Sequence, residues 1–151
     1  MMVSVAFYKG KKTIKRPQDL GLWVIDGMIR MITHSPYSHC EIVIDMQDGC
    51  FDCYSSSYRD GGVRKKTMAL PSDQWDILPT NVPLERILSY YAQTQGLGYD
   101  LLGVLSFVFR LKHNPKKYFC SEWCFNALTN QTNGERYSPD DLYHLITGDI
   151  Q

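Results

Sequence analysis

The chain has 151 residues, 44% of them hydrophobic and 13% aromatic, which is enough apolar material for one domain over residues 1–151 to bury its own core. Its 16 basic and 16 acidic side chains cancel, so no overall field favours nucleic acid. We therefore expect one self-sufficient domain and no nucleic-acid partner.

The N-terminal stretch MMVSVAFYKGKKTIKRP places its apolar run before its lysines, the reverse of the order in a signal peptide. The most apolar later run, 101–109, is about half the roughly 20 residues that a membrane-spanning helix needs. Five cysteines is an odd number, so a full disulfide framework is not expected. We expect a cytoplasmic protein with reduced thiols and no membrane anchor, of unknown oligomeric state.

The first half of the chain predicts one helix among short strands. Residues 3–8 are rich in Val and aromatics, which favours a strand, and apolar residues at helical spacing behind Pro17 predict a helix over about 18–33. Further strands are predicted at 39–45, 50–57, 63–68 and 74–79. The turn-like MQDG between the first two of these makes an antiparallel hairpin the simplest arrangement.

The second half is predicted to be helical. Residues 81–96 form a helix with Pro83 near its start and Gly96 as its stop, and 98–111 form an almost wholly apolar one. A third covers 120–128, and Ser138 can cap a fourth. This order predicts an α+β fold in which an antiparallel sheet packs against helices.

Cys120 is the strongest candidate nucleophile. It occupies the predicted first position of a helix, where unpaired backbone N–H groups and the helix dipole stabilise a thiolate. Cys124 follows one turn later between Trp123 and Phe125, so we expect it to pack in the core. Of the two cysteines, Cys120 is expected to be the exposed one.

His39 is the best-placed base. At the start of a strand its imidazole can project from the sheet edge toward a helix end, although a histidine there is often only solvated. Alternation along the strand puts Glu41 on the same face. If MQDG is the turn, Ser55 or Ser56 lies opposite His39 and could orient the imidazole; a frayed strand end is the alternative.

Two further patterns allow more than one interpretation. Cys50-x2-Cys53 and Cys120-x3-Cys124 resemble paired zinc ligands, but the first pair would point to opposite faces of a strand and two ligands leave a tetrahedral site incomplete. We therefore expect no metal and no other cofactor. In GLGYDLLG, residues 96–103, the middle residues either begin a helix or line a pocket, and both interpretations stay open.

In combination these motifs resemble a known family. GLGYDLLG followed by YFCSEW resembles the Gly-x-x-Tyr-x-x-x-Gly and Cys-Ser elements of the NlpC-type papain-like cysteine peptidases. Because YSHCEIVI precedes YFCSEW, the chain is similar to the circularly permuted branch, which includes lecithin retinol acyltransferase-like proteins and bacterial and viral hydrolases. CYSSSYRDGGVR is similar to the Ser-rich, Gly-Gly-Val-Arg segment found after the histidine strand. The resemblance covers roughly 18–128 and implies a circularly permuted papain-like fold.

The resemblance implies a nucleophile at Cys120, a base at His39, and a pocket edge at Tyr99 and Asp100. The orienting third residue is often a histidine in unpermuted members, and this chain has none between His39 and His113.

Ser55 is the preferred candidate for the third residue, with Cys53, Ser56 and Glu41 as alternatives. Ser56 and Glu41 are also candidates for contacting the substrate. Glu41 stands where the family commonly has glycine, so it could narrow the pocket or bind a cationic group.

The leading functional prediction is a cysteine hydrolase, a peptidase or amidase, that cleaves an amide or isopeptide bond through Cys120 and His39. Its partner would be a peptide, amide or acyl substrate. An acyl transferase or thioesterase that uses the same pair on a lipid or thioester is the alternative, and a catalytically inactive binding or structural module on the same fold is another.

Overall fold

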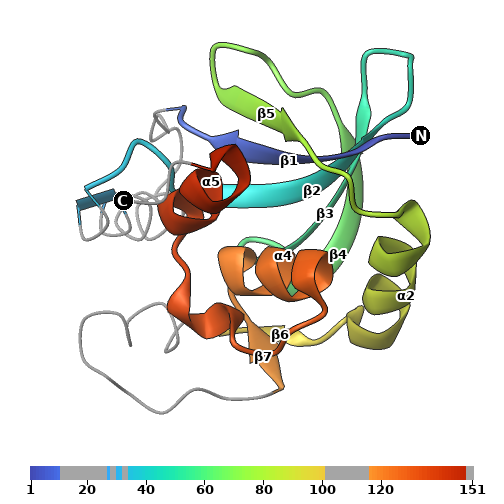
Figure 1. Ribbon diagram of the computed structural model, residues 1–151, viewed down its shortest axis with the longest axis vertical. Helices are drawn as coiled ribbons and strands as arrows, with labels where there is room; N and C mark the ends of the chain where they lie inside the picture. Colours follow the sequence, from blue (N-terminus) through green and yellow to red (C-terminus); the bar gives the residue numbers. More distant parts are fainter. Residues whose placement is uncertain (11–26, 28–29, 32–33, 101–115, 149–151) are drawn as a thin grey trace.

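A computed structural model of the chain describes residues 1–10, 27, 30–31, 34–100 and 116–148. The strands are β1 Val3–Tyr8, β2 His39–Asp45, β3 Phe51–Ser57, β4 Gly62–Met68, β5 Trp75–Pro79, β6 Gly98–Tyr99 and β7 Lys117–Tyr118. They form one seven-stranded, mostly antiparallel sheet in the order β5-β1-β2-β3-β4-β6-β7, curled into a half-barrel (Figure 1). The predicted α+β class with an antiparallel sheet is confirmed.

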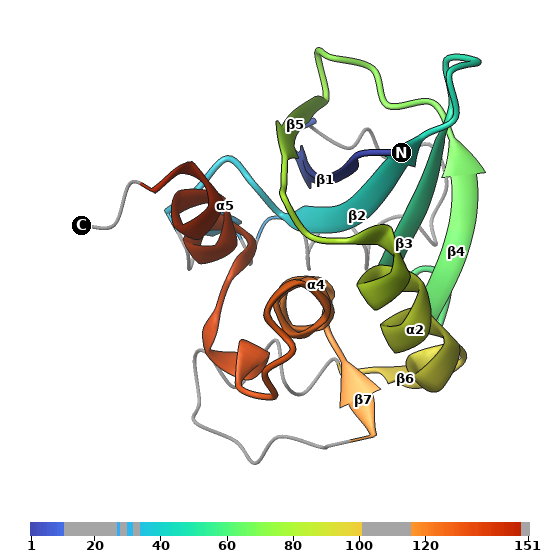
Figure 2. The same cartoon turned by 45° about the vertical axis from the view of Figure 1, so that its right-hand side comes forward.

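Three α-helices and one short 3-10 helix accompany the sheet in the described part of the chain. They are α2 Leu84–Thr94, α4 Cys120–Thr129, α5 Pro139–Thr147 and the 3-10 helix η1 Gly134–Arg136. Figure 2 shows α4 nearly end-on, with α2 on one side and α5 on the other. Because α4 contacts β2, β3 and both neighbouring helices, its N-terminus is held at the centre of the molecule.

Both faces of the sheet are covered at β1 and β2, so every residue from Val3 to Phe7 and from Cys40 to Ile44 is buried. Alternate side chains of these strands, including Val5 and Ile42, pack with α2, α4 and α5 in the main core. The intervening ones, Ala6 and Val43, join a smaller core with Cys53 and Leu70 on the opposite face. The two faces of β2 therefore lie in different environments.

The helices begin and end much as their sequences predict. Pro83 precedes the first turn of α2, and Gly96 has a positive φ just after its end. Ser138 caps α5, because its hydroxyl accepts the N–H of Asp141. α4 begins at Cys120, as predicted. The residue before it, Phe119, donates its backbone N–H to the Glu122 carboxylate at 3.4 Å.

One predicted helix is wrong at its start. Residues Gly98–Tyr99 form strand β6, which pairs with Gly62 of β4 and runs parallel to β7. The chain can come this close because Gly62 has no side chain: a Cβ there would overlap the Leu97 carbonyl oxygen. That oxygen accepts the N–H of Val63 at 2.8 Å.

The rest of that predicted helix, 101–111, lies outside the described residues. So does most of the predicted helix over 18–33, of which residues 27, 30 and 31 are helical. Among the helices that the structure describes, none combines the length and apolar character needed to cross a bilayer.

Replacing Gly62 by alanine should separate β6 from β4 and destabilise the protein. Gly61→Ala is the matched control, because Gly61 also has a positive φ (+81°) but its Cβ would meet nothing within 4 Å. The control should lose about 1 kcal/mol of unfolding free energy and Gly62→Ala at least about 2 kcal/mol more, as measured by urea unfolding. Equal losses would contradict the close approach.

Candidate active site

Cys120 opens α4, and its side chain lies where this helix end meets the start of β2. The residue before it, Phe119, is extended, so the helix and its unpaired N–H groups begin at the cysteine itself. The Cys120 thiol contacts the His39 imidazole and the Cys40 thiol, which come from consecutive residues of β2. Two chemically different groups, an imidazole and a thiol, therefore contact the Cys120 sulfur.

The prediction that Cys120 is exposed is wrong. Cys120 is 3% exposed, hardly more than Cys124 at 0%, because α4 is enclosed by the sheet and its neighbouring helices. Cys124 packs in the main core as predicted. The His39 side chain is 21% exposed and is the more accessible member of the pair with Cys120.

Glu41 holds the imidazole from the same strand. Nε2 of His39 and Oε1 of Glu41 are 3.0 Å apart, so the ring N–H donates to the carboxylate. This leaves Nδ1 as the ring nitrogen available to Cys120. Trp75 of β5 lies edge-on to the ring, with centroids 6.5 Å apart. The imidazole is thus fixed between a carboxylate and a thiol.

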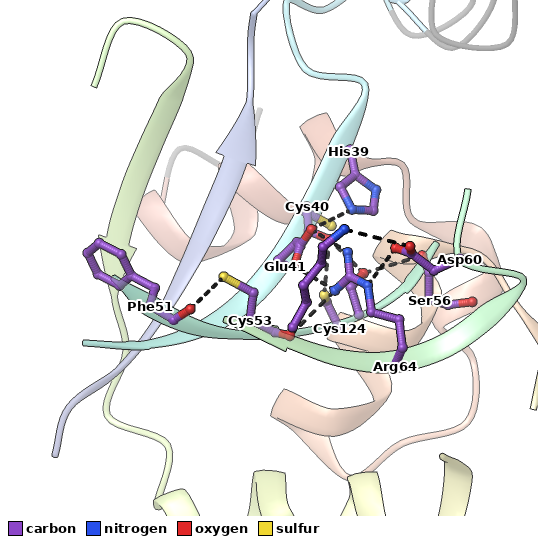
Figure 3. A network of polar contacts seen from close by, with 11 residues as sticks. His39, Cys40, Glu41, Phe51, Cys53, Ser56, Asp60, Arg64 and Cys124 are labelled. Carbon is purple, nitrogen blue, oxygen red and sulfur yellow. Dashed lines mark hydrogen bonds and ion pairs between the residues drawn. The ribbon is translucent and has the colours of Figure 1, made fainter. Parts of the chain in front are cut away.

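A partly buried arginine completes the network around Glu41 (Figure 3). The two terminal nitrogens of Arg64 donate to the two Glu41 oxygens, each at 2.8 Å, and its Nε donates to Asp60 at 2.9 Å. Glu41 is 1% exposed and the Arg64 side chain 16%. Both carboxylate oxygens of Glu41 are therefore occupied by groups of the protein.

These contacts place opposite charges on Cys120 and His39. The pKa of Cys120 lies well below its ordinary value, because the hydrogen bond from the Cys40 thiol and the positive His39 ring outweigh the opposing effect of burial. Burial alone would lower the pKa of His39, but the charge and hydrogen bond of Cys120, with Glu41, raise it to about 10. These shifts favour the thiolate form of Cys120 and the imidazolium form of His39.

The other groups around this pair keep fixed protonation states. Burial alone would raise the pKa of Glu41, but the hydrogen bonds from Arg64 and His39 lower it to about 2. Burial raises the pKa of the Cys40 thiol, so Cys40 stays protonated and can donate to Cys120. The Cys40 backbone carbonyl in turn accepts the Cys124 thiol at 3.7 Å.

Ser55 and Ser56 lie next to the site but face other groups. The Ser55 hydroxyl donates to the Cys40 carbonyl at 2.8 Å, and the Ser56 hydroxyl donates to the Tyr118 carbonyl at 2.6 Å; both serines are 0% exposed. They join β3 to β2 and β7. Within the described part of the chain, the polar groups on the His39 ring are Glu41 and Cys120.

The hairpin register explains why Ser55 is not opposite the histidine. The loop spans residues 46–50, one residue longer than the predicted turn, because Asp45 pairs with Phe51. Continued along the strands, this register puts Ser55 opposite Glu41 and Ser57 opposite His39. A shift of one residue moves every side chain of a strand to the other face relative to its partner.

Tyr99 and Asp100 take different positions. The Tyr99 ring packs edge-on against Tyr58, with centroids 5.6 Å apart. Its hydroxyl interacts electrostatically with Cys120. Burial is the main reason why the pKa of Tyr99 is raised, and the charge of Cys120 raises it further. The phenol therefore keeps its proton beside the thiolate. Asp100 is 2% exposed, and its backbone N–H donates to the Tyr118 carbonyl at 3.0 Å.

The sequence patterns did not single out Arg64 and Cys40. Arg64 pairs with Ser55 across β3 and β4, so alternation along three strands could have placed it on the face of Glu41. Cys40 was expected on the opposite face from His39, where it does lie in the main core. Its contact with Cys120 depends on the packing of α4, which no local pattern reports.

No group of three or more His, Cys, Asp or Glu side chains in the described residues is arranged to hold a metal ion. No protein-family model and no curated protein matches the sequence.

Glu41→Gln should flatten the acid branch of the stability profile. Because the pKa of Glu41 falls from 4.5 to about 2 on folding, its charge stabilises the protein above pH 4.5 and this contribution is lost as the pH falls toward 2. A fall of the Glu41 pKa from 4.5 to about 2 corresponds to about 3 kcal/mol of stability near neutral pH. Urea unfolding from pH 7 to 2 should show the gap between wild type and variant closing.

Asp52→Asn is the matched control for this titration, since it removes a carboxylate paired with Lys65, whose side chain is 43% exposed. It should change the acid branch much less than Glu41→Gln. Parallel profiles for wild type and Glu41→Gln would contradict the buried ion pair.

Cys40→Ala should raise the pH at which Cys120 becomes reactive, because it removes the thiol that donates to the thiolate. Cys40→Ser retains a donor and should shift this midpoint less. The measurement is the rate of Cys120 alkylation by iodoacetamide against pH, followed by mass spectrometry. Cys53→Ala, in the smaller core on the other face, is the control; an equal shift there would rule out a specific role for Cys40.

Proposed function

We propose that this protein is a cysteine hydrolase of the peptidase or amidase kind, with a circularly permuted papain-like fold. One observation carries the proposal: Cys120, at the first position of a helix, contacts a His39 ring whose other nitrogen is hydrogen-bonded to Glu41. A nucleophile, a base and a group that orients the base are the elements of covalent catalysis at an acyl group.

In the proposed reaction the Cys120 thiolate attacks the carbonyl carbon of an amide. The backbone N–H at the start of α4 donates to the oxyanion that forms. As the C–N bond breaks, the His39 imidazolium gives its proton to the departing amine, leaving an acyl group on the sulfur. Neutral His39 then takes a proton from water, the hydroxide attacks the thioester, and the thiolate is released.

Glu41 takes the orienting role in this proposal in place of Ser55. Its carboxylate holds Nε2 at 3.0 Å and stays ionised, so it both fixes the ring and favours the imidazolium. A serine hydroxyl carries no charge and would stabilise the imidazolium less. Ser55, Ser56 and Asp100 then support the backbone around the site, and Tyr99 lines it.

The arrangement of the motifs also supports the proposed fold. The strand that begins with His39 precedes the helix that begins with Cys120, and Tyr99 of GLGYDLLG lies close enough to sense the charge of Cys120. All five cysteines are free thiols, which suits a reducing compartment. We propose a peptide, amide or isopeptide as the substrate.

The test is a panel of peptide amides, isopeptides and acyl thioesters incubated with the purified protein. Cys120→Ala should abolish hydrolysis of the amides, and His39→Ala should slow it by at least about 10²-fold. Cys124→Ala is the matched control, because it removes a thiol one turn further along the same helix and should retain activity once folding is verified.

Other outcomes separate the alternatives. Turnover of acyl thioesters without amides would favour the acyl transferase or thioesterase. If no substrate turns over and Cys120 reacts with iodoacetamide no faster than a free thiol of equal exposure, the protein is not this enzyme and the inactive binding module is favoured.

A further inference from the structure

A row of alternating charges runs from the hairpin turn to the helix end. It joins Asp60, Arg64, Glu41, His39 and Cys120, with separations of 2.9 Å, 2.8 Å and 3.0 Å along its first three links. Glu41 and Cys120 are 1% and 3% exposed. Glu41 and Cys120 therefore have protein rather than water around them, while the His39 side chain between them is 21% exposed.

The charge balance of the buried part depends on Arg64. A thiolate at Cys120 and a carboxylate at Glu41 are two negative charges with one positive ring, His39, between them. An uncompensated charge in such an environment costs several kcal/mol, and the usual relief is to bind a proton. Without a second cation, either Cys120 or Glu41 would become neutral.

We propose that Arg64 is a positioning residue for the reaction: it supplies the positive charge that lets the Cys120 thiolate, the His39 imidazolium and the Glu41 carboxylate exist together in the buried site. This inference rests on the proposed function only in taking Cys120 and His39 as the reacting pair. Arg64 itself touches neither of them and acts through Glu41.

The contacts of Arg64 suit this role better than those of a lysine would. Its planar guanidinium meets both Glu41 oxygens with parallel hydrogen bonds, and a third nitrogen is held by Asp60. NH1 also approaches the Cys53 carbonyl at 3.4 Å. The guanidinium is thus held in place from β3, from the turn before β4 and from β2.

The other titratable groups that face the row in the described residues do not supply this charge. Cys53 lies near Glu41 and Arg64, and burial raises the pKa of its thiol to about 12, so it is neutral. Cys40 and Tyr99 face Cys120 as a neutral thiol and a neutral phenol. Lys66 lies 3.8 Å from the Asp60 carboxylate at the outer end of the row, but its side chain is 51% exposed and its ion pair is with Asp60 and not with Glu41.

The experiment measures the pH midpoint of Cys120 alkylation by iodoacetamide in the whole protein, which needs no substrate. In Arg64→Gln this midpoint should rise by about one to two pH units, so alkylation well below it slows on the order of 10- to 100-fold. Arg64→Lys retains the charge without the paired hydrogen bonds and should shift the midpoint less. NMR titration of the His39 ring in the same variants should show a changed midpoint.

Lys65→Gln is the matched control. It removes the same charge from the next residue of β4, but Lys65 pairs with Asp52 and lies on the other face. Its midpoint should stay at the wild-type value. A folded Arg64→Gln protein with an unchanged midpoint, or a Lys65→Gln shift of equal size, would overturn the proposal.

A double variant covers the case in which Arg64→Gln does not fold, because Glu41→Gln/Arg64→Gln leaves no unpaired charge at the buried position of Glu41. Asp60 also loses Arg64, but its side chain is 27% exposed and lies 3.8 Å from Lys66. In Glu41→Gln alone, Arg64 remains as an extra positive charge that favours the thiolate. The double variant should therefore have a higher alkylation midpoint than Glu41→Gln, and equal midpoints would overturn the proposal.

These outcomes are independent of turnover. A shifted midpoint in a protein that hydrolyses nothing would sustain the role of Arg64 and reject the proposed function. Amide hydrolysis without a shift of the alkylation midpoint would support the proposed function and reject the role of Arg64.

Discussion

A carboxylate that is 1% exposed, Glu41, is the constraint on which the candidate site depends. Burying an ionised carboxylate is unfavourable unless cations and hydrogen bonds compensate for the lost water. Here Arg64 supplies two hydrogen bonds from β4 and His39 supplies one from β2. The sheet must therefore hold a single register across β2, β3 and β4, since a slip in any pair would leave the Glu41 carboxylate buried without its partners.

The first three residues of β2 make three different contacts in the candidate site. His39 and Glu41 point to the same face, where they meet each other, while Cys40 points to the main core and meets α4. Cys120 can contact both His39 and Cys40 because α4 packs against β2 and begins beside the first residues of that strand.

Local patterns in the sequence predict the parts of the site that depend on one element. The helix that begins at Cys120, the strand that begins at His39 and the shared face of His39 and Glu41 all follow from spacing and alternation, and the structure has each of them. Cys120 itself was expected to be exposed and is buried, because its exposure depends on several packed elements and not on α4 alone.

What local patterns could not provide is pairing across strands. One extra loop residue in the β2–β3 hairpin shifts the pairing by one position, so that Ser57 in place of Ser56 lies opposite His39 and Ser55 lies opposite Glu41. The contact of Arg64 with Glu41 joins residues 23 positions apart. The start of the helix predicted over 98–111 was misjudged for the same reason. Local signals predict a helix from Gly98, but Gly98 pairs with Gly62 at the edge of β4 and so belongs to the sheet.

The charged groups also set the pH range expected for the proposed reaction. In that proposal a thiolate nucleophile and a protonated leaving-group acid must be present together. The upper limit is then where His39 loses its proton, at about pH 10, and the lower limit is where Cys120 gains one. Glu41 stays ionised down to about pH 2 and therefore sets neither limit near neutral pH. A neutral hydroxyl in place of this carboxylate would leave the imidazolium less stabilised and lower the upper limit. The ionised, arginine-bound carboxylate thus widens the range from its alkaline end, while Cys40 extends it at the acidic end by donating to the thiolate.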